Sequence, residues 1–288
     1  MSSTQQLKSR IRSVKSTKQI TRAMQMVAAS KMRRAQEASK TTMPYTRAAR
    51  RLLHYLAGQG AATSHPLFAT RDIKTRLIVV IAADKGLAGA YNANVLKQYV
   101  QLLQSDEDHR IKDKTIAVGR KASQFVTRLK HVEVVGVYDN LPDKPSDTTF
   151  RAILDSIHDM FVAQEVDAVD IVFTRFVNSM TQQADTVRLL PAGITPEGED
   201  DVADEARFEP SPRAVLDAIA TRMIGAREYQ ALLDARASEH SQRMLAMKSA
   251  TDNATNLVDD LTLEMNKQRQ GAITQELTEI SAGVEAMS

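Results

Sequence analysis

Near its C-terminal end the chain reads MLAMKSATDNATNLVDDLTLEM (residues 244–265), a run without proline or glycine. Its small and apolar residues recur at alternating steps of three and four, at Met244, Met247, Thr251, Ala254, Val258, Leu261 and Met265. This spacing is the a and d pattern of a left-handed coiled coil, sustained over three heptads. The run therefore predicts a long helix that packs along a second helix.

Both ends of the chain favour helix. All eight prolines lie between residues 44 and 212, the last 76 residues contain three glycines, and the first 57 contain none. Proline and glycine in a helix interior cost about 3 and about 1 kcal/mol, so the two ends are predicted to be long helices. We expect the first over residues 4–55, with a break or kink near Pro44, and the last to begin at Ser211-Pro212.

The N-terminal helix is the obvious partner of the C-terminal one. Its apolar residues form a drifting stripe at three- and four-residue steps, interrupted at Thr17 and Lys18. They are Leu7, Ile11, Val14, Ile20, Met24, Val27 and Met32. We therefore expect the two terminal helices to pair antiparallel, with a separate domain inserted between them.

The middle of the chain has a different period. Runs such as RLIVVIAAD are rich in β-branched residues and alternate with helical patterns, which is typical of a mostly parallel sheet with crossover helices. The expected strands are 76–84, 114–119, 133–139, 170–176 and 185–191, and the expected helices are 91–105, 120–130 and 147–165. Only a short linker joins the last two strands, so they could form an antiparallel pair at one edge.

The predicted fold class is α/β with long helices, in which a Rossmann-like domain of about five strands is inserted into an antiparallel two-helix coiled coil. The predicted domains are 1–57, an N-terminal coiled-coil helix; 58–210, the inserted α/β domain; and 211–288, a C-terminal coiled-coil helix. Within the inserted domain, the acidic segment 192–210 is expected to be a surface loop.

Charge is concentrated at the N-terminal end. Residues 1–51 contain 13 Lys and Arg and a single acid, Glu37, although the whole chain carries a net charge of only +3. Such a helix fits an acidic environment: nucleic acid, anionic lipid or an acidic protein surface. A solvated helix face is the alternative interpretation.

Several classes of protein do not fit the composition. The absence of cysteine excludes disulfides, thiolate metal sites and thiol catalysis. No apolar run is long enough to span a membrane, and the lack of a signal peptide or presequence predicts a bacterial cytoplasmic protein.

Catalytic motifs are missing as well. Gly86 and Gly89 follow the first strand, where phosphate-binding loops occur, but no phosphate-loop motif is present. The histidines are scattered without metal-ligand spacing. We therefore expect neither cofactor, metal nor catalytic residues.

Long runs of the chain resemble the gamma subunit of F-type ATP synthases. The family's opening helix is similar to SRIRSVKSTKQITRAMQMVAASKMRRAQ (9–36), and its closing helix to SEHSQRMLAMKSATDNATNLVDDLTLEMNKQRQGAITQELTEI (238–280). In the middle, VIAADKGLAGAYNANV (80–95) and GRK (119–121) also match. The resemblance covers the whole chain, with small departures at Ala83, Ala88 and Ala90.

The resemblance implies a rotor subunit, present once per complex and without a cofactor. In this family the terminal helices enter a hexamer of three alpha and three beta subunits, and the inserted domain lies on the ring of c subunits beside epsilon. Proton flow turns the ring and gamma with it, while ATP chemistry takes place on beta. The implied location is peripheral, on the cytoplasmic face of the bacterial plasma membrane.

The resemblance also implies which residues contact the alpha–beta hexamer: Met24, Arg243, Arg269, Gln270, Thr274 and Glu276. Met24 matches the residue that faces an acidic lever loop of beta, and Arg243 is expected across from it on the antiparallel helix. Arg269 and Gln270 match residues that hydrogen-bond to a beta loop, and the last two are neighbouring candidates. Coiled-coil packing is the alternative role for Met24, and a solvated helix face for Arg269 and Gln270.

Two other functions compete with the rotor. A basic coiled-coil protein that binds nucleic acid would interleave aromatic and basic residues for base stacking, yet residues 1–44 contain no aromatic residue. A nucleotide-binding α/β enzyme would need the phosphate loop that is missing. Neither alternative explains both terminal runs.

Overall fold

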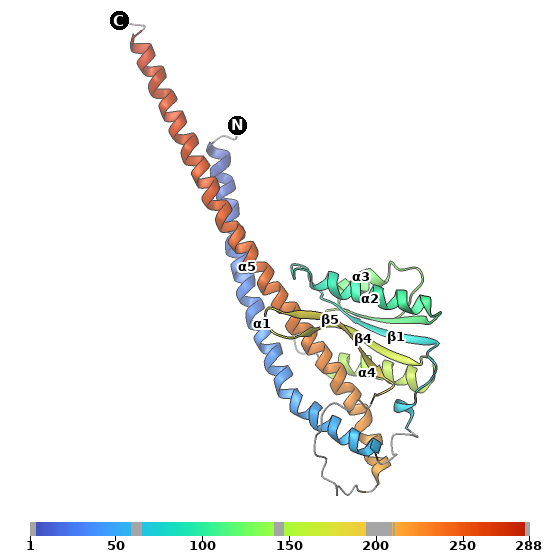
Figure 1. Cartoon of the computed structure of the whole chain (residues 1–288). Coiled ribbons are helices and arrows are strands. Elements are labelled where there is room, and N and C mark those ends of the chain that lie inside the picture. The colour runs from blue at the N-terminus through green and yellow to red at the C-terminus, as the bar shows by residue number, and fades with distance from the viewer. Residues whose placement is uncertain (1–3, 59–64, 141–146, 194–208, 210, 286–288) are drawn as a thin grey trace. The chain divides into compact units, whose positions relative to one another are not determined.

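The computed structural model describes residues 4–58, 65–140, 147–193, 209 and 211–285 (Figure 1). Two long helices flank the rest of this part of the chain, α1 (Thr4–Gly58) and α5 (Pro212–Glu285). The chain forms two compact units: Met1–Ala28 together with Arg243–Ser288, and Ala29–Gln242. Each long helix therefore contributes to both units. The domain boundaries given above stay a prediction.

In the first unit, α1 and α5 form the predicted antiparallel pair. Leu7 and Ile11 of α1 form a buried cluster with Val258 and Leu261 of α5. Further along α1, the hydroxyl of Thr21 lies 2.8 Å from that of Thr251, in a buried hydrogen bond. Rising numbers in α1 thus meet falling numbers in α5, and all seven residues of the predicted seam are buried or half-buried.

α1 continues through Pro44, so of the predicted break or kink the break is wrong, and the kink stays a prediction. Proline removes one backbone donor from the helix, and side-chain bonds between α1 and α5 hold the neighbouring turn. Gln230 Nε2 donates to Ser39 Oγ at 2.6 Å, and Thr42 Oγ1 donates to Gln230 Oε1 at 3.3 Å. Tertiary contacts of this kind outweigh a local helix-breaking tendency.

The second unit contains a five-stranded sheet in the order β3-β2-β1-β4-β5. The first four strands are parallel, and β5 pairs antiparallel with β4 at one edge, as predicted. The strands are β1 (Thr75–Ile81), β2 (Lys112–Val118), β3 (Glu133–Tyr138), β4 (Ala168–Phe176) and β5 (Gln182–Leu190). The helices between them are α2 (Tyr91–Asp108), α3 (Arg120–Val126) and α4 (Asp147–Val162), and a short 3-10 helix, η2 (Pro66–Phe68), precedes β1. Every predicted strand and helix of this region is confirmed, with ends shifted by up to four residues.

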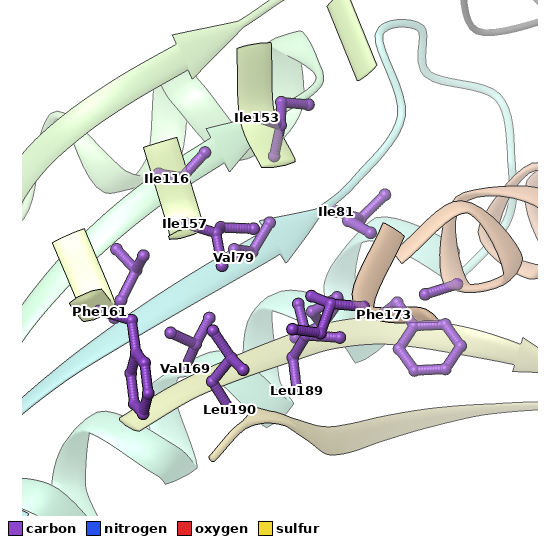
Figure 2. Packing of buried hydrophobic residues seen from close by; sticks show 14 of the residues in the cluster. Val79, Ile81, Ile116, Ile153, Ile157, Phe161, Val169, Phe173, Leu189 and Leu190 are labelled. Carbon is purple, nitrogen blue, oxygen red and sulfur yellow. The ribbon is translucent and has the colours of Figure 1, made fainter. Parts of the chain in front are cut away.

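The two faces of the sheet have separate cores. On one face α2 and α3 cover Ile78, Val80 and Val172. On the other face the strands present Val79, Ile81 and Ile116 to the buried residues of α4, which are Ile153, Ile157 and Phe161 (Figure 2). Strands buried on both faces explain the continuous apolar runs in the sequence.

α5 is itself a core helix of this second unit. Ala220, Ile224, Leu232 and Ala235 of α5 belong to the same buried cluster as the α4 residues. Close approach of the two helices is possible because α5 has Gly225, where an added Cβ would lie 2.9 Å from Leu154 Cδ2. The sheet therefore folds against a helix that comes after it in the chain.

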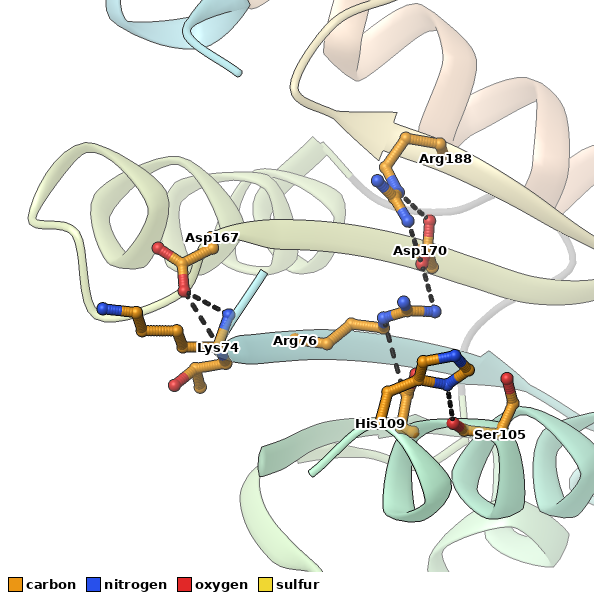
Figure 3. Close-up of polar contacts among 9 residues, drawn as sticks. Lys74, Arg76, Ser105, His109, Asp167, Asp170 and Arg188 are labelled. Carbon is orange, nitrogen blue, oxygen red and sulfur yellow. Dashed lines mark hydrogen bonds and ion pairs between the residues drawn. The ribbon is translucent and has the colours of Figure 1, made fainter. Parts of the chain in front are cut away.

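A buried ionic network joins the amino-terminal ends of β1 and β4 to β5 (Figure 3). Arg76 Nη1 lies 3.1 Å from Asp170 Oδ2. The carboxylate of Asp170 also accepts hydrogen bonds from Nε and Nη2 of Arg188. Arg76 Nε lies 3.2 Å from Asp106 Oδ2. Burial, with a further contribution from Asp106, raises the pKa of Asp113 to about 8. The raised pKa favours the neutral form of Asp113, in a network where Arg76 contacts two other carboxylates, Asp106 and Asp170.

We predict that Asp170→Asn lowers the free energy of unfolding by about 3–5 kcal/mol, because it leaves two arginines without their shared buried counter-charge. Denaturant unfolding of the full chain measures this effect. Asp72→Asn, at an exposed position, serves as the control and should change stability by less than about 0.5 kcal/mol. Equal effects of the two substitutions would contradict the network's role.

A second buried acid lies on α5. Glu228 is 1% exposed, and neither of its carboxylate oxygens has a hydrogen-bond partner in the described part of the chain. Burial, with a smaller contribution from the nearby Asp155 carboxylate, raises the pKa of Glu228 from 4.5 to about 8. The unfolded chain thus releases this proton at a lower pH than the folded chain. Stability therefore falls as the pH rises from 4.5 to about 8.

We predict that Glu228→Gln stabilises the chain by about 1–3 kcal/mol at pH 8.5 and changes stability little at pH 4.5. The amide has a similar size and removes the cost of ionising a buried group. Thermal unfolding at both pH values checks this, with the exposed Glu107→Gln as the control. A gain of the same size at both pH values would disprove the assignment to ionisation.

Candidate functional site

The candidate site is the surface of the two terminal helices, where four of the six predicted contact residues are exposed, Met24 is half-buried and Arg243 is buried. Met24 of α1 is half-buried beside the seam, and Arg243 of α5 is 9% exposed. Counting from the pair Thr21–Thr251, residue 248 lies opposite Met24 in an antiparallel arrangement. Arg243 is five residues from this point, about 1.4 turns of helix and about 7.5 Å along the axis. Its pairing with Met24 stays a prediction.

The last part of α5 extends beyond the described part of α1. By the same register, residue 268 lies opposite Thr4, the first described residue of α1. From Arg269 to Ala282 every residue of α5 is exposed. The four predicted contact residues of this segment, Arg269, Gln270, Thr274 and Glu276, are therefore all accessible. The hydroxyl of Thr274 bonds to the carbonyl of Gln270 within the helix, at 2.9 Å.

Sequence reasoning missed an apolar stripe in the same segment. Ile273, Leu277 and Ile280 are 49%, 61% and 65% exposed. At roughly 100° per residue they lie within an arc of about 60° on one side of α5. The spacing of four and three residues between them was visible in the sequence, and it continues the helical period of the seam.

The predicted polar residues border this stripe. On a helical projection, Arg269 and Glu276 lie on one side of it, and Gln270 and Thr274 lie on the other. The opposite half of the helix has only small or polar residues, namely Gly271, Ala272, Gln275, Thr278, Glu279 and Ala282. The end of α5 thus has two chemically different faces.

The basic residues of α1 make a second part of the surface. In the first unit Lys8, Arg10, Arg12, Lys15 and Arg22 are all exposed. Exposed ion pairs contribute about 0–1 kcal/mol each. This surface therefore suits weak and reversible contact with an acidic partner.

The turn after β1 does not have the chemistry of a phosphate site. Asp84 Oδ1 accepts the backbone N–H groups of Arg120 and Asn140 at 3.0 and 2.9 Å, which are groups that a phosphate would bind. Asp84 Oδ2 lies 3.6 Å from Arg236 Nη2 on α5. Positive φ angles occur in this turn at Leu87 and Gly89, whereas Gly86 is not among the residues with positive φ. The turn joins the sheet to α5 through a carboxylate.

Among the described residues, no three His, Cys, Asp or Glu side chains gather as a metal site. No helix in the described ranges has an apolar segment suited to crossing a bilayer.

Comparison with known proteins gives consistent results over the full length. A family model described as ATP synthase matches residues 3–287. The ATP synthase gamma chain of Stenotrophomonas maltophilia is 39% identical and covers 100% of both chains. That of Symbiobacterium thermophilum is 41% identical and covers 96% of both.

Solved structures share the fold. A chain from the Euglena gracilis mitochondrial ATP synthase covers 99% of this chain and 94% of its own length, with a TM-score of 0.70 and 20% identity. A chain from the central stalk and c-ring of the Tetrahymena thermophila enzyme covers 80% and 99%, with a TM-score of 0.62 and 23% identity. The full-length identity to the bacterial chains identifies the family, and these structures support the architecture of a sheet flanked by two long helices. The resemblance of the terminal runs is thereby confirmed, and the chain belongs to the ATP synthase gamma chain family, as a non-catalytic subunit.

Proposed function

We propose that the chain is the central rotor subunit of a proton-translocating F-type ATP synthase. It transmits torque between a membrane ring of c subunits and the catalytic beta subunits, and so drives ATP synthesis and controls ATP hydrolysis and proton flow. The observation that carries the proposal is the antiparallel helix pair from which α5 continues as a single exposed helix, in a chain related over its full length to gamma chains.

The geometry suits a rotating shaft. A paired seam resists twisting, and the exposed end of α5 offers an apolar stripe bordered by polar residues on one half only. When α5 turns inside a ring of three beta subunits, each beta subunit meets the stripe in succession. One side of α5 carries Ile273 and Leu277, and the opposite side carries Gly271 and Gln275. The two sides interact differently with the same beta surface, so the catalytic sites of the three beta subunits are driven into different states.

The contacts must also break at every step. The exposed cations of α1 attract acidic segments of beta with about 0–1 kcal/mol per pair, which thermal motion overcomes. Met24 on α1 and Arg243, Arg269, Gln270, Thr274 and Glu276 on α5 are the proposed contact residues.

The proposed partners are three alpha subunits, three beta subunits, epsilon and the ring of c subunits, with one copy of the chain per complex. ATP binds and reacts on beta, so the chain itself needs no cofactor. Its proposed location is the cytoplasmic face of a bacterial plasma membrane, held there through the other subunits. Membership of the gamma chain family favours this role over the binding of nucleic acid.

We predict that the chain stimulates ATP hydrolysis by an alpha–beta core from the same organism at least several-fold. The increase should saturate at one chain per three beta subunits, because a single shaft serves the whole ring. Steady-state hydrolysis during titration with the purified chain measures this. An absence of stimulation, together with separate elution on gel filtration, would refute the rotor role and make a salt titration of DNA binding the next experiment.

We predict that Met24→Lys impairs coupling more than assembly, because it places a cation at a half-buried position among Lys and Arg neighbours. Membranes that carry this variant should contain normal amounts of complex but make at least twofold less ATP per proton passed. Met26→Lys, where the side chain is 61% exposed, is the matched control. An unchanged ratio of ATP to protons for Met24→Lys would rule out this role.

A further inference from the structure

Between residues 236 and 242, α5 buries polar side chains on every face. Ser238 and Ser241 are 0% exposed, Glu239 is 4% and His240 is 5% exposed. A helix in a globular protein ordinarily buries one apolar stripe and leaves its polar residues in water. Burial of polar groups costs free energy unless each is hydrogen-bonded. The partners of these side chains therefore determine whether this segment can be buried.

One side of this segment is attached to the carboxyl ends of the parallel strands. Arg236 Nη2 lies 3.6 Å from Asp84 Oδ2, with both side chains 13% exposed, and Arg236 Nη1 bonds to Glu239 Oε2 at 3.0 Å. The other oxygen of Asp84 accepts the N–H groups of Arg120 and Asn140. A single carboxylate therefore connects α5 to the segments that follow β1, β2 and β3.

The other side is attached to β4 and to the turn between β4 and β5. Ser238 Oγ donates to the carbonyl of Thr174 at 3.1 Å, and Ser241 Oγ donates to the carbonyl of Ser179 at 2.7 Å. Gln182 Nε2 donates to Ser241 Oγ at 3.1 Å. Gln242 Nε2 donates to Gln182 Oε1 at 2.6 Å.

These two sets of bonds grip the helix from opposite directions. Successive residues of an α-helix are rotated by roughly 100°. Relative to Arg236, the side chains of Ser238, Ser241 and Gln242 therefore project at about 200°, 140° and 240°. Rotation of α5 about its axis in either sense would stretch bonds on both sides.

We propose that the side chains of Asp84, Arg236, Ser238, Ser241, Gln182 and Gln242 form a clamp that fixes the rotational position of α5 within the unit Ala29–Gln242. On the rotor function proposed above, on which this inference rests, the clamp passes torque between the α/β unit and α5. Apolar contacts are non-directional and tolerate sliding, whereas hydrogen bonds and ion pairs weaken steeply with misalignment. The residues of the clamp act by positioning α5 and touch no nucleotide.

Asp84→Asn tests one side of the clamp. The amide oxygen can still accept the N–H groups of Arg120 and Asn140, while the charge that faces Arg236 is lost. Two activities are compared in the complete complex: ATP hydrolysis by the detached alpha–beta–gamma core, where the shaft turns without load, and the pH gradient that membrane vesicles reach by ATP-driven proton pumping, where it turns against load. We expect unloaded hydrolysis within twofold of wild type and a gradient at least threefold smaller.

Further variants separate the clamp from simple loss of folding. Ser241→Ala removes two hydrogen bonds on the opposite side and should give the same split between the two activities. Arg236→Gln removes the ion pair with Asp84 and also that with Glu239, so adding Asp84→Asn to it should cause no further loss. Glu107→Gln, exposed on α2, should leave both activities unchanged.

The outcomes distinguish the two proposals. Normal pumping by Asp84→Asn and Ser241→Ala, in complexes where the wild-type chain stimulates hydrolysis, would overturn the clamp and leave the rotor role intact. Equal losses of loaded and unloaded activity would also overturn it, because they indicate a defect in folding or assembly. A wild-type chain that fails to stimulate the core would refute the rotor role itself.

Discussion

The packing of α5 against the sheet is the interaction on which the rest of the structure depends. Ala220, Ile224, Leu232 and Ala235 complete the core that β1, β4 and α4 begin. Without this helix, the cluster on this face of the sheet would expose apolar surface to water, at a cost of about 25 cal/mol for each Å². The α/β unit therefore requires a helix that lies after it in the sequence, and the chain must complete α5 before the sheet is covered.

A single helix then has two different packing roles. In its first half α5 presents alanine and branched residues to a sheet, and from residue 244 it presents the heptad seam to α1. Between these roles lies the buried polar segment 236–242. Small residues make both packings possible, since Gly225 admits Leu154 of α4, and Ala28 and Ala254 are buried in the unit of the helix pair. Large side chains at these positions would separate the elements and lose dispersion contacts.

Sequence reasoning succeeded where one local pattern determined one element. The seam from Met244 to Met265 and the β-branched run of β1 each have a period that only one secondary structure satisfies. It did not foresee that α1 runs unbroken through Pro44, where bonds from Gln230 of α5 hold the neighbouring turn, because such bonds depend on residues distant in sequence.

The clamp was hidden for the same reason. In the sequence, serine and arginine on a helix indicate a face exposed to solvent. Only the structure shows that these side chains bond to the sheet and to the segments that follow its strands. Glu228 shows the limit most clearly, since nothing near it in sequence indicates that it is 1% exposed. The apolar stripe of Ile273, Leu277 and Ile280 is different, because its spacing could be recognised in the sequence. The structure shows that no described element covers it.

The buried hydrogen bond between Thr21 and Thr251 helps to specify the register of the helix pair. Alanine, methionine and threonine in a seam pack almost equally well if one helix shifts by a heptad, so apolar contact alone specifies the register poorly. A shift would separate the two hydroxyls and break this buried hydrogen bond, whose net contribution is about 0.5–1.5 kcal/mol. The hydroxyl of Thr251 also bonds to the carbonyl of Met247, at 2.8 Å, which holds it in place. A polar pair within an apolar seam is a known means of fixing register at some cost in stability, and a shaft under torque needs this property more than it needs strong cohesion.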